Sequence, residues 1–138
     1  MTKEFDKFLN SRHLASLAVC KTAAPWAFNA FYAYDAVNSV LLIASDENTT
    51  HGQILQENPK IAGTIALDTK VVNLIKGVQF EGEISAANSD ESEIYFAKFP
   101  FARAGNPKIW KIVINSAKLT DNKILFGKKL KWQRNGGI

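Results

Sequence analysis

Cysteine is almost absent from this sequence, and its scarcity excludes two kinds of stabilising chemistry. Cys20 is the only cysteine among 138 residues, so the chain can form no internal disulfide and no cluster of thiolates that could hold a metal. It lies in the apolar stretch LASLAVC, where we expect a buried and unreactive thiol.

Long hydrophobic runs are also lacking. Although 46% of the residues are hydrophobic, the apolar segments are too short and too interrupted to span a bilayer. The first residues, MTKEFDKFLNSRH, are charged throughout and lack the apolar centre of a secretory signal. We therefore expect a cytoplasmic protein that does not enter a membrane.

The motifs of several enzyme classes are missing as well. His13 and His51 stand in neither an HxxxH nor an HExxH arrangement, which leaves a metal site without support. The sequence has no GxSxG elbow and no GxGxxG or Walker-type glycine loop, so serine hydrolase and nucleoside triphosphate chemistry are unsupported. The residues by themselves indicate no catalytic group and no metal ligand.

The hydrophobic pattern predicts a protein built mostly from strands. The length fits a single domain that covers residues 1–138 and buries one core. The predicted strands are 13–20, 25–35, 40–45, 60–68, 77–87, 108–121 and 122–132. The predicted helices are 3–12, 50–58 and 88–99. Because closure removes exposed strand edges, this many strands in a small domain predicts a small β-barrel.

Residues 41–59, LLIASDENTTHGQILQENP, place polar side chains between a buried strand and a short helix. The first N–H groups of a helix have no intrahelical partners, and the helix dipole adds partial positive charge there. Thr49, Thr50 and His51 would supply further donors, with Ser45 approaching from the strand end. This turn could therefore receive a phosphate.

Helix capping is the alternative explanation for the same cluster. Asn48 or Thr49 has the side chain of a typical N-cap residue. Asp46 and Glu47 favour this interpretation, because carboxylates beside a phosphate would repel it unless they point away. The sequence alone leaves both interpretations open.

The aromatic segment 25–35, PWAFNAFYAYD, would place alternate side chains on opposite faces of a strand. One face would hold Trp26, Phe28, Ala30, Tyr32 and Tyr34, which would fill a core or a subunit interface. The other face would hold Ala27, Asn29, Phe31 and Ala33. Small residues around Asn29 and Phe31 would leave room for a flat ligand, although all of these side chains could instead simply pack.

The last third of the chain is basic. From Lys108 onward there are seven lysines and Arg134 against one acid, Asp121. Such a segment could bind nucleic acid, with Trp110 and Trp132 as stacking platforms. Alternating lysines also mark the solvated face of strands, and their dispersion favours that interpretation.

The order of these features resembles the pyridoxamine 5′-phosphate oxidase-like proteins. The segments that resemble the family are VLLIAS, HGQILQENPKIAGTI, VQFEGEI, YFAKFP and KILFGKKLKW. The resemblance runs from about His13 to Trp132 and points to a small bacterial branch rather than to the oxidase itself. It implies an FMN-binding split barrel that works as a homodimer: a mainly β fold of six or seven antiparallel strands with two or three short helices.

The resemblance also implies which residues contact the FMN. The strand NAFYAY would lie along the flavin, the end of VLLIAS would contact the ring or ribityl chain, and the Thr-Thr-His turn would grip the phosphate. A segment of the fifth strand would lie at the pyrimidine side of the ring, a contact that the other subunit can supply, and the closing Phe126-Gly127-Lys128 would approach the flavin. The implied contacts are Asn29, Ala30, Phe31, Ala44, Ser45, Thr49, Thr50, His51, Gly77, Gln79 and Lys128.

Several positions depart from the family pattern. The family's phosphate turn typically has an Arg-Lys pair where this chain has Thr50 and His51, and an imidazole is a weaker clamp for a dianion than a guanidinium. Asn29 replaces a basic residue of the oxidase, and Gly77 replaces a glutamine, so synthesis of pyridoxal phosphate is not carried over. The missing charge could come from Lys76, Lys128 or Lys129.

Two functions follow from the resemblance. The first is a flavin-dependent oxidoreductase of unknown substrate, in which the cofactor performs the redox step and no side chain need act as acid or base. The second is a binding protein on the same scaffold that holds a flavin or a haem without turnover.

Overall fold

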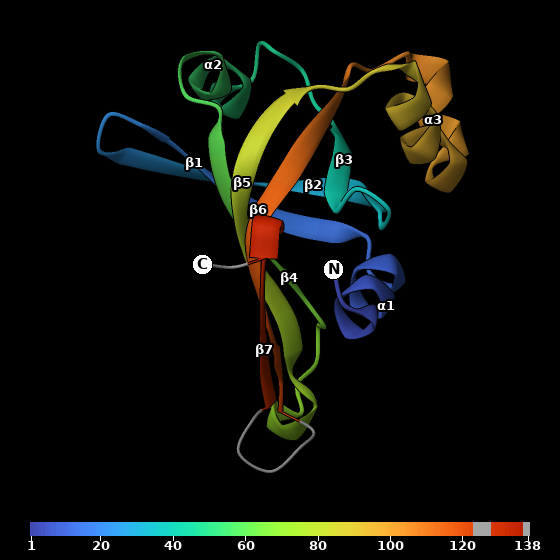
Figure 1. Cartoon of the computed structure of the whole chain (residues 1–138). Helices are drawn as coiled ribbons and strands as arrows, with labels where there is room; N and C mark the ends of the chain where they lie inside the picture. Colours follow the sequence, from blue (N-terminus) through green and yellow to red (C-terminus); the bar gives the residue numbers. More distant parts are fainter. Residues whose placement is uncertain (123–127, 137–138) are drawn as a thin grey trace.

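The computed structural model describes residues 1–122 and 128–136, with seven antiparallel strands in one sheet (Figure 1). The strands are β1 (Leu14–Lys21), β2 (Ala24–Asp35), β3 (Val40–Ala44), β4 (Lys60–Ala66), β5 (Lys76–Ala86), β6 (Ile109–Asp121) and β7 (Lys128–Gln133). The α-helices are α1 (Lys3–Ser11), α2 (Thr50–Glu57) and α3 (Ser89–Lys98). Short 3₁₀ turns are η1 (Val72–Leu74), η2 (Pro100–Gly105) and η3 (Arg134–Gly136).

The sheet closes into a ring. Its strands follow the order β3-β2-β1-β4-β5-β6, and β6 pairs again with β3, so that Val40 lies opposite Val113. β7 lies outside the ring and pairs only with the second half of β6. Figure 1 shows the paired arms of β5, β6 and β7 extending well below the ring. The predicted mainly β split barrel with six to seven strands and short helices is confirmed.

The helices cover different parts of the ring. α1 buries Phe5, Phe8 and Leu9 in the main core, as their helical spacing predicts. α3 packs on the outside of the ring and forms a second apolar cluster with β2, β3 and β6, to which it contributes Tyr95 and Phe96. No helix in the described ranges is long and apolar enough to cross a membrane.

The two halves of β2 differ in burial, which the alternation of its side chains alone did not predict. Its last four residues are all buried, because α3 covers the outer face there. Its first half projects from the ring, so that Trp26 is 48% exposed although it shares a face with core residues. The paired end of β1 projects with it, and Cys20 is half-buried there rather than buried as predicted.

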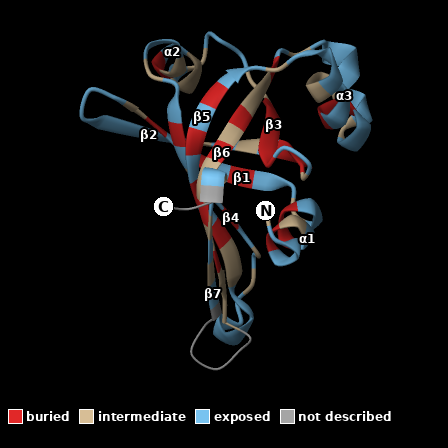
Figure 2. Ribbon diagram, viewed as in Figure 1, coloured by how far each residue is buried: buried red, intermediate tan, exposed pale blue. Residues whose placement is uncertain are grey.

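Small side chains occupy the outer face of the central strands. Ala18 of β1 lies directly between Ala27 of β2 and Ala62 of β4 in the pairing register. All three are exposed, and Figure 2 shows the exposed residues of this part of the ring in pale blue. This leaves a flat strip that another surface can approach closely.

Candidate functional site

The end of β3 is held rigidly between two neighbouring segments. The backbone N–H of Ser45 donates to the carbonyl of Lys108 (3.2 Å), and its own carbonyl accepts a bond from Trp110 Nε1 (3.0 Å). The Ser45 side chain therefore projects from a fixed backbone at the point where the chain turns toward α2.

The turn that follows is stabilised by a helix cap. Thr49 Oγ1 accepts a hydrogen bond from the Gly52 N–H (3.0 Å) and donates one to the Asp46 carbonyl (2.8 Å). Asp46 Oδ1 accepts the N–H of Asn48 (2.8 Å), so this carboxylate is engaged within its own turn. The capping interpretation is confirmed, with Thr49 as the cap.

Capping leaves two donors unused. The backbone N–H groups of Thr50 and His51 belong to the first turn of α2, where no intrahelical carbonyl can reach them. Neither has a hydrogen-bond partner in the part of the chain that the structure describes. The cap and an anion contact are thus compatible at this turn.

Gly52 allows the turn to fold back onto the helix. A Cβ at this position would lie 2.5 Å from the Asp46 carbonyl oxygen and 2.8 Å from that of Glu47. Because both are backbone atoms, they cannot move aside, and only glycine permits this approach.

His51 is engaged on its edge and on its face. Its Nε2 lies 2.7 Å from Ser45 Oγ, with the donor set by the imidazole tautomer, and its ring stacks on Phe28 with centroids 3.6 Å apart and planes 4° apart. Burial lowers the pKa of His51 below its ordinary value of 6.5, since desolvation disfavours the charged ring. At neutral pH the residue is therefore a neutral donor and acceptor rather than a cation.

A hollow of about 330 Å³ lies beside this turn, between β2, the end of β3, α2 and α3. Its size falls within the usual range for small-molecule sites. Its lining consists of Phe28, Asn29, Ala30, Phe31, Ala44, Ser45, Asp46, Thr49, His51 and Tyr95. Seven of the eleven residues implied by the family resemblance belong to this lining, from three separate segments of the chain.

The wall formed by β2 is aromatic with one amide. Phe31 is 54% exposed and lies against His13 (ring centroids 5.9 Å apart) and Phe99 (5.8 Å). Asn29 Oδ1 accepts a hydrogen bond from Ser16 Oγ (2.9 Å), which turns the amide NH₂ into the remaining donor of that side chain. A flat ligand with carbonyl oxygens at its edge would match this wall.

The hollow has one charged group in its described lining, the carboxylate of Asp46. Neither lysine nor arginine belongs to that described lining. Lys108 is near the turn, but its ammonium pairs with Glu47 and lies 4.2 Å from the centroid of the Trp110 ring. A phosphate here would meet backbone amides and hydroxyls without a free cation.

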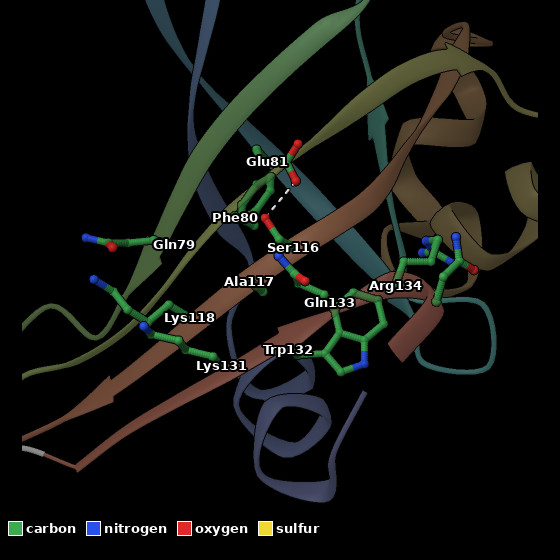
Figure 3. Close-up of a pocket in the computed structure, with 11 residues that line it drawn as sticks. Gln79, Phe80, Glu81, Ser116, Ala117, Lys118, Lys131, Trp132, Gln133 and Arg134 are labelled. Carbon is green, nitrogen blue, oxygen red and sulfur yellow. Dashed lines mark hydrogen bonds between the residues drawn. The ribbon is translucent and has the colours of Figure 1, made fainter. Parts of the chain in front are cut away.

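Four predicted contacts lie elsewhere. Thr50 is exposed on α2 and is not part of the lining, whereas Gly77 and Gln79 lie on β5. Gln79 lines a second, larger groove of about 990 Å³ along β5, β6 and β7 (Figure 3). Phe126 and Gly127 fall outside the described residues, and Lys128 is described only as the first residue of β7. All eleven assignments remain predictions.

Sequence reasoning missed three residues of the hollow. Phe28 belongs by alternation to the core face, and it reaches the hollow only because β2 leaves the ring there. Asp46 belongs to the lining, although the sequence indicated only that its carboxylate would repel a phosphate. Tyr95 comes from α3, and no local pattern indicates that this helix packs on β2 and β3. The described residues contain no group of three or more His, Cys, Asp or Glu that could hold a metal ion.

The chain is similar to curated bacterial proteins over almost its full length. It is 40% identical over 135 residues to a UPF0306 protein of Klebsiella pneumoniae, covering 95% of this chain and 92% of that protein. It is 38% identical over 136 residues to the UPF0306 protein YhbP of Escherichia coli, covering 96% and 92%. A search with protein-family models found no match.

Solved structures with the same fold have low sequence identity to this chain. A haem-binding protein from Mycobacterium smegmatis has a TM-score of 0.74 at 15% identity; the match covers 89% of this chain but only 53% of that one. A pyridoxamine 5′-phosphate oxidase-related, FMN-binding protein from Nostoc punctiforme has a TM-score of 0.70 at 8% identity, covering 96% and 90%. An FAD-binding protein from Mesorhizobium loti has a TM-score of 0.71 at 16% identity, covering 83% and 87%. Similarity at these identities establishes the shared fold.

Proposed function

The chain belongs to the UPF0306 family, and from its split-barrel fold and the lining of the hollow beside α2 we propose that it binds FMN there, as a flavin-dependent oxidoreductase. The solved neighbours described as binding FMN, FAD or haem support a flat-cofactor scaffold. The observation on which the proposal depends is that one hollow gathers aromatic, amide and hydroxyl groups beside two unpartnered helix amides.

The ring end of a flavin fits the residues that are present. Ala30 and Ala44 keep the floor of the hollow shallow, so a flat molecule can lie against the backbone. The amide NH₂ of Asn29 can donate to a ring carbonyl, while Phe31 and Tyr95 exclude water from one side. A bound flavin would supply hydride or single-electron transfer, and the protein would supply position and a dry surface.

The phosphate end fits less well. A phosphate could accept one hydrogen bond each from the Thr50 N–H, the His51 N–H and the Ser45 hydroxyl. The described lining, however, offers no cation to neutralise its charge. We therefore expect FMN to bind more weakly here than in family members with an Arg-Lys pair at this turn.

A homodimer is the second part of the proposal. The strip formed by Ala18, Ala27 and Ala62 is flat, exposed and adjacent to Asn29, so a second copy could pack on it and close the open side of the hollow. Closure of this kind would remove water from the ring and raise the strength of every polar contact in the hollow.

Mass spectrometry of the purified protein under denaturing conditions tests the proposal. We expect one FMN per chain after incubation of the wild-type protein with the cofactor. Thr50→Gln should keep this FMN and Thr50→Glu should lose it. Thr50→Arg should lower the dissociation constant for FMN at least tenfold. The three variants differ in charge at one exposed position beside the two free amides, so they isolate the electrostatic contact. Equal retention by Thr50→Glu and Thr50→Arg would contradict the phosphate position.

Reduction separates the enzyme from a carrier. An FMN-loaded sample whose flavin absorbance bleaches with a nicotinamide donor and returns in air supports an oxidoreductase. Flavin absorbance that such a donor leaves unchanged supports the binding protein.

Haem is the alternative ligand, and His51 is the observation that favours it. Because burial lowers the pKa of His51, its imidazole is neutral at neutral pH and so in the form that can bind iron. Its Nε2, however, is held by Ser45 and its ring by Phe28, so ligation would require both contacts to break. A Soret band that disappears in His51→Ala would favour haem over flavin.

The tryptophans give nucleic-acid binding no support. The Arg134 guanidinium lies 5.5 Å from the Trp132 ring centroid, and the Trp132 side chain also packs against the main core. Trp110 lies beneath the Lys108 ammonium and donates its Nε1 proton to the Ser45 carbonyl. Each indole thus already has a cation beside its ring and packs in part against the main core.

A further inference from the structure

Three polar side chains line up across β5, β6 and β7 in the second groove. Gln79 lies directly opposite Lys118, and Lys118 lies directly opposite Lys131 in the pairing register. Figure 3 shows the tips of these three side chains on the same side of the sheet, away from Trp132. We call these three residues the polar row.

The two lysines of the polar row face each other without a carboxylate. Like charges directly opposite each other on neighbouring strands destabilise a sheet. Lys76, further along β5, pairs with Asp121 (3.7 Å), but within the described ranges neither Lys118 nor Lys131 has an acidic oxygen at ion-pair distance. The fold keeps two ammonium groups together and leaves their charge uncompensated.

The rest of the groove adds little to this positive charge. Arg134 also lines it, but its guanidinium lies 5.5 Å from the Trp132 ring centroid and donates to the carbonyls of Asn38, Ser39 and Ile114, away from the polar row (Figure 3). The one carboxylate of the described lining is Glu81, whose Oε2 accepts a hydrogen bond from the Ser116 hydroxyl (2.7 Å). Beside the polar row the groove therefore offers two lysines, one acid and about 990 Å³ of open space.

We propose that Gln79, Lys118 and Lys131 bind the phosphate or carboxylate groups of an anionic organic substrate. Two ammonium groups can neutralise a dianion, and the amide of Gln79 can donate a further hydrogen bond beside them. Lysine binds as a mobile point charge, so tetrahedral phosphates and planar carboxylates are both suitable. The groove shares no lining residue with the hollow beside α2, and the proposal takes the place of the flavin contact that the family resemblance implies for Gln79.

Thermal unfolding in the presence of small anions tests the site. We expect pyrophosphate or citrate to raise the melting temperature of the wild-type protein more than sodium chloride at equal ionic strength. The larger shift of the two identifies phosphate or carboxylate as the preferred group. The shift should disappear in Lys118→Gln/Lys131→Gln, which should be at least as stable as the wild type without anion because the repulsion is gone.

A matched variant separates the site from overall charge. Lys21→Gln/Lys60→Gln removes the same charge at exposed positions on β1 and β4, and it should keep the full anion-dependent shift. The exposed single variant Lys131→Gln should weaken pyrophosphate binding at least tenfold by calorimetry, which covers the case in which the double variant fails to fold.

Two results would overturn the proposal. One is a wild-type shift no larger than that with sodium chloride. The other is a Lys118→Gln/Lys131→Gln variant that loses both FMN retention and the anion-dependent shift in melting temperature. The polar row would then hold the cofactor's phosphate rather than a substrate. A wild-type protein that binds pyrophosphate at the polar row but never retains FMN would contradict the proposed flavin and leave this site standing.

Discussion

The hydrogen bonding of the hollow depends on the tautomer of His51. With the imidazole neutral, the tautomer decides whether Ser45 Oγ donates to Nε2 across the 2.7 Å contact or accepts from it and turns its own proton toward the hollow. A ligand that needs a donor would select the tautomer in which His51 donates and Ser45 turns its proton outward. The pair can thus adapt to the ligand without a change in backbone.

Acid should destabilise the protein through His51. The folded state lowers the pKa of this ring by burial, so between that pKa and about 6.5 the unfolded chain holds more protons than the folded one. The free energy of unfolding contributed by this residue therefore rises with pH and is lost as pH falls. We expect the dependence of unfolding free energy on pH, measured by urea denaturation, to be shallower in His51→Gln; an unchanged slope would contradict a half-buried, neutral ring.

Residues 41–59 show which features of the site local sequence predicts and which depend on tertiary contacts. The sequence indicated a cap at Asn48 or Thr49 and unpartnered amides after it as two open interpretations, because both follow from local helix chemistry, and the structure shows Thr49 as the cap. It did not predict that His51 would stack on Phe28, since the two lie on different elements that meet only after the ring closes. The polar residues and their spacing therefore predicted the position of the turn. Tertiary packing determines the burial of His51 and thus its neutral form.

Most helices and strands lie close to the predicted ranges. α3 begins with a capping box, in which the Asn88 side chain accepts from the Glu91 N–H and the Glu91 side chain accepts from the Asn88 N–H, both at 2.9 Å. What the sequence did not predict is how strands deviate from regularity. The pairing of β5 and β6 shifts between Glu81 and Gly82, so that Asn115 of β6 becomes the extra residue of a bulge.

Gly82 makes this bulge possible and should not tolerate a side chain. A Cβ there would lie 2.0 Å from the Val113 carbonyl oxygen, a backbone atom held by the sheet. We expect Gly82→Ala to lower the free energy of unfolding by at least about 2 kcal/mol in urea denaturation. Gly105→Ala is the matched control, since a Cβ at Gly105 would meet nothing within 4 Å, and its stability should stay within about 0.5 kcal/mol of wild type.

At the scale of the whole molecule, the strip of Ala18, Ala27 and Ala62 is an exposed part of the ring surface. A sheet face of small side chains is suited to close packing against an identical face, and two-fold self-complementary contacts are the commonest kind in soluble oligomers. The ring topology itself could be guessed from strand number, but which strands adjoin could not, because no local signal specifies that β3 pairs with β6.

Assembly should respond to one substitution at the centre of the strip. We expect the wild-type protein to sediment as a dimer and Ala18→Arg to sediment as a monomer, because a long cation would sit between Ala27 and Ala62. Ala97→Arg, at an exposed position of α3, adds the same side chain elsewhere and should leave the dimer intact. A monomeric wild type would contradict this surface as the interface.

The β3–β6 pairing also determines when the barrel can form during synthesis. Val40 must wait for Val113, 73 positions later, before the ring has a final edge to join. A nascent chain that has released only β1 to β5 lacks the strand that closes the ring, so its sheet keeps an unpaired edge at β3. Such long-range closure gives the protein a high contact order, and its folding should be slow, nearly post-translational and sensitive to holdase supply.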